Sequence, residues 1–110
     1  MWEDILKASP MRNYFKRIFD LMESMPDRKF GQQELYDALR YELQRAGKRE
    51  RGMPSSRDIG NVMRASAKGN LGSMQRHQGL EEFNNLVRYI EKDINNAYSK
   101  PTFKWAGGSK

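Results

Sequence analysis

Residues 54–68, PSSRDIGNVMRASAK, decide the fold because they predict a short capped helix with one apolar and one basic face. Ser55 is a preferred N-cap residue, and Asp58 stands three positions later, as in a capping box. A carboxylate in the first turn also suits the positive end of the helix dipole. We therefore expect a helix over residues 55–68.

The two faces of this helix differ in their chemistry. At about 100° per residue, Ile59, Val62 and Met63 fall on one side. Arg and Lys contact phosphates, Arg can pair with guanine and Asn with adenine, so the other side has the groups that a helix needs in a major groove. An ordinary solvated helix face is the alternative interpretation. The polar side consists of Arg57, Asn61, Arg64 and Lys68.

The positive charge of the chain is concentrated in its middle third. The net charge is +6, and residues 45–79 alone hold eight Lys or Arg against two acids. The loop at 48–54, KRERGMP, supplies part of this excess. Such an asymmetry predicts a polyanionic partner, either nucleic acid or an acidic protein surface. A membrane partner is not expected, because no apolar run approaches the roughly 20 residues of a transmembrane helix.

Composition limits the class of protein further. A chain of 110 residues is long enough to form one domain around a single core. The absence of Cys excludes thiolate metal sites, thiol nucleophiles and disulfide frameworks. The opening residues, MWEDILKASP, carry acids where a signal peptide would be positive. We expect a cytoplasmic protein, located in the host cytoplasm if the chain is viral.

Apolar residues recur at helical spacing in four segments, and no segment predicts a strand. Pro26 ends the first helix because it lacks an amide donor, and Gly47 is the expected C′ residue of the second. The segments span residues 10–25, 32–46, 55–68 and 83–99.

The expected fold is therefore mainly α, a compact helical domain of about four helices over residues 1–99. Residues 100–110 form a basic aromatic tail, in which Phe103 and Trp105 either stack on bases or pack back onto the core. Packing back is favoured, since burial of an aromatic side chain is worth a few kcal/mol. The expected core comprises Tyr14, Phe15, Ile18, Phe19, Met22, Leu35, Leu39, Leu43, Ile59, Val62, Met63, Phe83, Leu86, Val87, Ile90 and Ile94.

Residues 54–64, PSSRDIGNVMR, follow two long helices and a polar loop. This order and motif resemble the helix-turn-helix core of winged-helix domains, especially small phage and mobile-element proteins with a P-t-x-r-x-I-G-x-x-L-R third helix. The resemblance covers residues 11–76 and implies a DNA-binding domain that regulates transcription. It also implies that Gly60 allows close approach of the second helix. The matching positions are Pro54, Ser55, Arg57, Ile59, Gly60, Met63 and Arg64.

The segment that would form the wing is weakly patterned. A winged helix continues after its third helix with two strands, whereas residues 69–79, GNLGSMQRHQG, hold only Leu71 and Met74 as apolar residues. Three glycines and scattered polar residues favour a loop there. At most a degenerate wing is expected.

Catalytic sites find little support in the sequence. His77 is the single histidine, so a metal site would depend on carboxylates as its other ligands. Ser55, Asp58 and His77 do not make a convincing catalytic triad, because the first two are better explained as helix caps. We expect no enzyme, no cofactor and no metal.

Two functions from different classes fit these features. The first is a non-enzymatic nucleic-acid-binding protein, with duplex DNA favoured over RNA, that uses the 55–68 helix and the 48–54 loop. The alternative is a phage, virion-associated or regulatory module that docks its basic face on an acidic protein. The residues expected to bind nucleic acid are Arg57, Asn61, Arg64, Lys68, Lys48, Arg49, Arg51 and Arg76.

Overall fold

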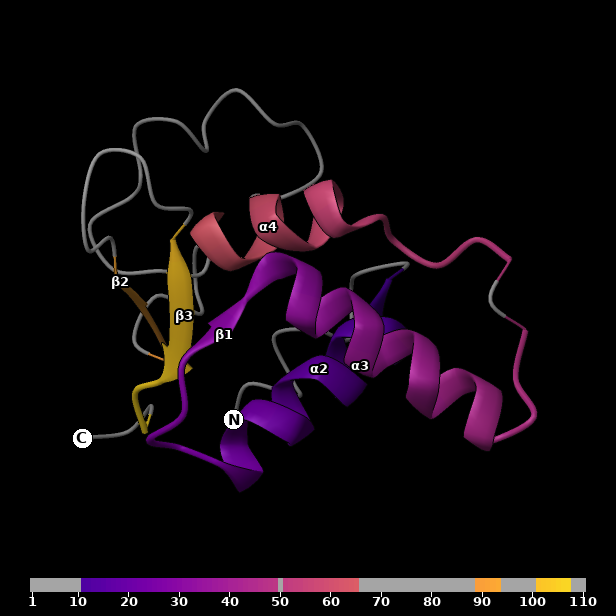
Figure 1. Ribbon diagram of the computed structural model, residues 1–110, viewed down its shortest axis with the longest axis horizontal. Helices are drawn as coiled ribbons and strands as arrows, with labels where there is room; N and C mark the ends of the chain where they lie inside the picture. The colour runs from indigo at the N-terminus through magenta and orange to yellow at the C-terminus, as the bar shows by residue number, and fades with distance from the viewer. Residues whose placement is uncertain (1–10, 50, 66–88, 94–100, 108–110) are drawn as a thin grey trace.

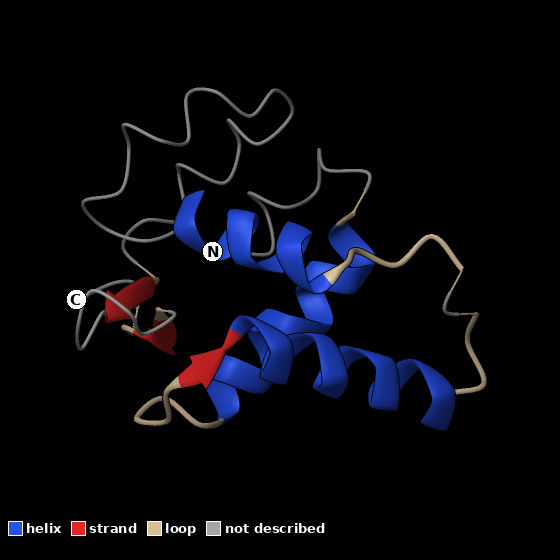
Figure 2. Ribbon diagram, turned by 45° about the horizontal axis from the view of Figure 1, so that its top comes forward, coloured by secondary structure: helices blue, strands red, loops and turns tan. Residues whose placement is uncertain are grey.

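The computed structural model describes residues 11–49, 51–65, 89–93 and 101–107, and these form three helices and three short strands (Figure 1). The strands make an antiparallel sheet in the order β1-β3-β2, which lies beside one end of the helices (Figure 2). The elements are α2 (Arg12–Ser24), β1 (Phe30–Gly31), α3 (Gln32–Arg45), α4 (Ser56–Ala65), β2 (Ile90–Asp93) and β3 (Thr102–Trp105).

The apolar residues of α2 recur at the spacing of a helix. Its buried residues are spaced three and four apart, so they share one face of the helix. The helix begins at Arg12 with Met11 as N-cap, two residues later than the sequence predicts. It ends at Ser24, and the expected turn at Pro26 follows. The buried residues of α2 are Phe15, Ile18, Phe19 and Met22.

Helix α3 ends in a Schellman motif. Gly47 has a φ of +68°, and its N–H donates to the carbonyl of Gln44 at 3.1 Å. The N–H of Lys48 donates to the carbonyl of Leu43 at 2.8 Å. These two bonds satisfy carbonyls that the helix leaves unpaired, and they confirm Gly47 as the C′ residue.

Replacing Gly47 with alanine is expected to destabilise the fold by about 1–2 kcal/mol, because a Cβ disfavours the left-handed conformation. Chemical denaturation measures this change. Gly47→Asn is the matched control and should cost less, since Asn tolerates positive φ better. Equal stability of the wild type and Gly47→Ala would contradict the motif.

The prediction of a fourth helix is wrong at residues 90–93, because these residues form β2 instead. Ile90 lies opposite Trp105 and Glu91 opposite Lys104, so β2 pairs with a segment that the sequence places in the tail. A short apolar run fits a buried strand as well as a helix, and periodicity alone does not separate the two. The expectation that the chain has no sheet is therefore also wrong.

Strand β3 brings the aromatic residues of the tail into the core. Phe103 and Trp105 are buried at 0% and 6% exposure and alternate with less buried residues, as the period of a strand requires. The centre of the Trp105 ring lies 6.1 Å from the centre of the Phe19 ring and 5.5 Å from the centre of the Tyr89 ring. The interpretation that these aromatics pack back is confirmed, although as part of the central strand rather than as a covering tail.

The core thus joins helix stripes to the sheet. Leu35, Leu39 and Leu43 of α3 are buried as expected, whereas Tyr14 is only partly buried. The fourth-helix core residues Phe83, Leu86, Val87 and Ile94 lie outside the described residues, as does the segment 69–79, which is expected to be a loop or at most a degenerate wing. The buried aromatic residues that the sequence-based core omits are Phe30, Tyr89, Phe103 and Trp105.

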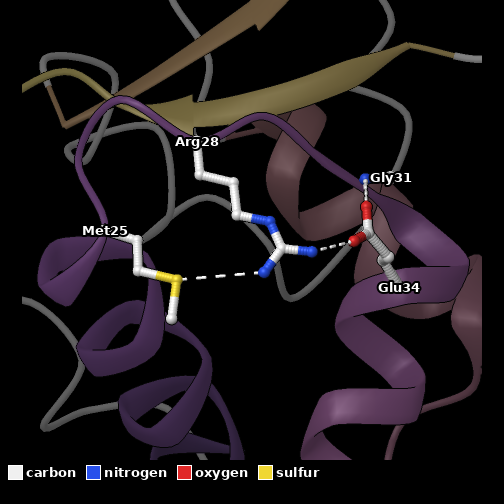
Figure 3. Close-up of polar contacts among 4 residues, drawn as sticks. All are labelled: Met25, Arg28, Gly31 and Glu34. Atoms are coloured by element: carbon white, nitrogen blue, oxygen red, sulfur yellow. Dashed lines mark hydrogen bonds and ion pairs between the residues drawn. The ribbon is translucent and has the colours of Figure 1, made fainter.

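Arg28 connects α2 to α3 at the turn before β1 (Figure 3). Its guanidinium donates to Glu34 Oε2 at 2.6 Å and approaches Met25 Sδ at 3.8 Å. It also lies 4.7 Å from the centre of the Phe30 ring. The N–H of Gly31 donates to Glu34 Oε1 at 3.2 Å, so one carboxylate caps α3 and pairs with Arg28. This cluster orients the start of α3, the helix on which α4 packs.

Candidate nucleic-acid interface

The start of α4 is fixed by reciprocal capping bonds. The N–H of Asp58 donates to Ser55 Oγ at 3.1 Å, and the N–H of Ser55 donates to Asp58 Oδ2 at 3.3 Å. The N–H of Ile59 donates to the carbonyl of Ser55 at 2.9 Å, which closes the first helical turn. The predicted capping box is confirmed. The helix is described as far as Ala65, so the end predicted at residue 68 lies outside the described residues.

The apolar face of α4 is buried as predicted. Ile59, Val62 and Met63 belong to the core, and α4 packs on α3 and β2 (Figure 1). This packing turns the opposite side of the helix outward. Arg57 is exposed there, whereas Asn61 and Arg64 are partly buried. The polar face is therefore less open than the helical wheel alone suggests.

Arg64 is held by two amide side chains. Its guanidinium donates to Asn61 Oδ1 at 3.5 Å and to Gln32 Oε1 at 3.4 Å. Because both amide oxygens face Arg64, the NH2 groups of Asn61 and Gln32 are directed away from it. These are groups that can donate to a base edge or a phosphate. Gln32, the first residue of α3, thus joins the candidate site, and the sequence reasoning missed it.

Gly60 makes room for this arrangement. A Cβ at this position would collide with Gln32 Oε1 and would lie 2.9 Å from Gln32 Cδ and 3.0 Å from Arg64 Nη1. The space beside Gly60 is thus occupied by the side-chain amide of Gln32, from the first residue of α3. A glycine in the middle of a predicted helix is the sequence signal that could have indicated a facing residue.

A double-mutant cycle tests this contact. Alanine is better than glycine in a helix by about 1 kcal/mol, but the added Cβ must displace Gln32. We expect Gly60→Ala to leave the free energy of unfolding nearly unchanged or lower it in the wild type. In a Gln32→Ala background it should raise that free energy by about 1 kcal/mol. An equal effect in both backgrounds, measured by chemical denaturation, would show that Gln32 does not occupy the space beside Gly60.

The predicted basic loop lies between α3 and α4. Lys48, Arg49 and Arg51 are all exposed. The phenol of Tyr14 donates to the carbonyl of Arg51 at 3.4 Å and ties this loop to α2. The structure therefore places an exposed basic segment directly before the capped start of α4. Of the predicted site residues, Lys68 and Arg76 lie outside the described residues.

The described residues contain neither a metal-binding cluster nor a membrane-spanning helix. Among them, no group of three or more His, Cys, Asp or Glu side chains could hold a metal ion. None of the described helices has both the length and the apolar character needed to cross a membrane. Comparisons of the chain with protein families, with curated proteins and with solved structures find no significant match.

Proposed function

We propose that this chain is a non-enzymatic nucleic-acid-binding protein that uses the outward face of α4 and the preceding basic loop, with duplex DNA as its ligand. The observation that carries the proposal is the position of α4. Its apolar face is buried, and exposed Arg57 follows closely after the exposed cations Lys48, Arg49 and Arg51. A helix anchored in this way can enter a groove while neighbouring cations contact phosphates.

The order of the elements supports the same proposal. In the part of the chain that the structure describes, two helices with a short strand between them precede α4, and two paired strands follow it. A winged-helix domain likewise continues after its third helix with two strands. In this proposal α3 and α4 form the helix-turn-helix, α4 is the recognition helix, and β2 with β3 takes the place of the wing.

Binding to a labelled random-sequence duplex at several salt concentrations tests the proposal. The logarithm of the binding constant should fall linearly with the logarithm of the salt concentration, with a slope of about −0.9 for each neutralised phosphate. A matched RNA duplex in parallel tests the preference for DNA. Absence of binding at low salt would remove the nucleic-acid proposal and leave an acidic protein as the partner.

A further inference from the structure

An open hollow lies between α2 and the turn that follows α3. Its volume is about 730 Å³. Helix α2 contributes Lys16, Arg17 and Asp20 to its lining, and the turn contributes Lys48 and Arg49. No residue of α4 lines it. The hollow is thus a separate surface from the α4 face, although Lys48 and Arg49 belong both to its lining and to the basic loop.

The charge of the hollow favours an anion. Among the residues that the structure describes, four cationic side chains line it against one carboxylate, Asp20. Lys16 Nζ lies 2.9 Å from Asp20 Oδ2, so this carboxylate already has a cation beside it. The C-terminus of α3 adds about half a negative charge, which is small against the remaining excess. Arg17, Lys48 and Arg49 therefore give the hollow a positive potential.

The backbone of one wall is fixed, and a hydrogen bond links it to the other wall, through groups other than the charged ends of these cations. The Schellman motif at Gly47 fixes the backbone of Lys48 at the end of α3. The hydrogen bond from Tyr14 to the carbonyl of Arg51 ties the loop to α2. The folded chain thus positions cations on both sides of the hollow before any ligand arrives, which lowers the entropic cost of binding.

The form of the hollow suits an extended phosphate chain better than a small molecule. Small-molecule pockets bury most of their ligand among apolar and aromatic groups. Here Lys16, Lys48 and Arg49 are exposed, and Leu43 and Tyr14 add apolar surface among the described residues. Exposed Lys and Arg side chains are the usual contacts of a phosphodiester backbone.

We propose that this hollow is a second nucleic-acid site, which holds the phosphodiester backbone of a strand that continues past the α4 face. Lys48 and Arg49 connect the two surfaces because they belong to both. The inference rests on the proposed function, since its ligand is the same nucleic acid. It adds Arg17 of α2 to the residues that contact phosphate.

Three charge reversals separate the hollow from the α4 face. Arg17→Glu changes the hollow, Arg57→Glu changes α4, and Arg40→Glu, on the exposed side of α3, is the matched control for net charge. The readout is the binding constant for a random-sequence duplex and its salt slope. We expect Arg17→Glu and Arg57→Glu each to weaken binding by about tenfold and to make the salt slope shallower by about one. Arg40→Glu should change both the binding constant and the slope much less. Arg17→Gln should act in the same direction, and it replaces the reversal if Arg17→Glu does not fold.

Two other results would decide between the hollow and the α4 face. If Arg17→Glu behaves like Arg40→Glu while Arg57→Glu weakens binding, the hollow is not a site and the proposed function stands. If only Arg17→Glu weakens binding, the hollow is the principal site and the assignment of α4 as the binding helix is wrong.

Inorganic phosphate, compared with chloride at equal ionic strength, tests for a free phosphate ion as the ligand. Stronger competition by phosphate would overturn the assignment to a phosphodiester backbone.

Discussion

Replacing Phe103 with alanine is expected to destabilise the protein by about 3–5 kcal/mol, the usual cost of removing a buried aromatic side chain. Phe103 is fully buried in the central strand, where it lies opposite Phe30 of β1 and Lys92 of β2. Because small domains are stable by only about 5–15 kcal/mol, the variant should be close to unfolding at ambient temperature. The unfolding midpoint in urea measures this loss.

Lys104→Ala is the matched control for this prediction. Lys104 is the next residue of β3, its side chain is 39% exposed, and its ammonium lies 3.8 Å from the carboxylate of Glu91. A surface ion pair of this kind contributes at most about 1 kcal/mol. If Phe103→Ala were as stable as Lys104→Ala, residues 102–105 would be an appended tail, and β3 would not be part of the core.

The second large effect concerns charge at the proposed interface. Arg51→Gln/Arg57→Gln should lower the affinity for a random-sequence duplex by up to about 50-fold at roughly 0.1 M salt. The salt slope should become shallower by up to about two, since each lost phosphate contact removes nearly one released counterion. Both residues are exposed, so the fold should tolerate the change.

A variant with the same net charge separates contact from the overall field of the protein. Lys29→Gln/Arg40→Gln removes two exposed cations, from the turn before β1 and from the middle of α3. It should leave the salt slope close to that of the wild type. Equal losses in the two double variants would mean that general charge attraction accounts for binding and that the α4 face makes no particular contact.

The helices could be predicted because their signals are local. The apolar stripes of α2 and α3 recur within a few turns, Gly47 marks the end of α3, and Ser55 with Asp58 marks the start of α4. Each of these signals acts between residues at most five positions apart. Such interactions are visible in one stretch of sequence without knowledge of the rest.

The sheet could not be predicted in the same way because its pairs are distant in sequence. Phe30 lies opposite Phe103, and Ile90 lies opposite Trp105. The strand β1 has only two residues, too few to show a period. In β3, the alternation of Phe103 and Trp105 with polar residues is itself a strand signal. The segment PTFKWAGGSK is nevertheless short and Gly-rich, which favours a tail over a strand.

The candidate site was predictable in composition but not in exposure. A helical wheel places Arg57, Asn61 and Arg64 on one side of α4, opposite its apolar face. It contains no information on the neighbouring helix, which brings Gln32 to Arg64 and partly buries it. The hollow also depends on the packing of α2 against the turn after α3, a contact between segments that are separated in sequence.

Amide chemical-shift mapping of the 15N-labelled chain with a short duplex tests the central claim most directly, because it locates the ligand on the surface. The account predicts that the largest shifts occur at residues 48–51 and in α4 around Arg57 and Asn61. The amides of β3 should shift least among the described elements. Saturable shifts centred on β3, with residues 48–61 unchanged, would contradict the assignment of α4 and its preceding loop as the nucleic-acid interface.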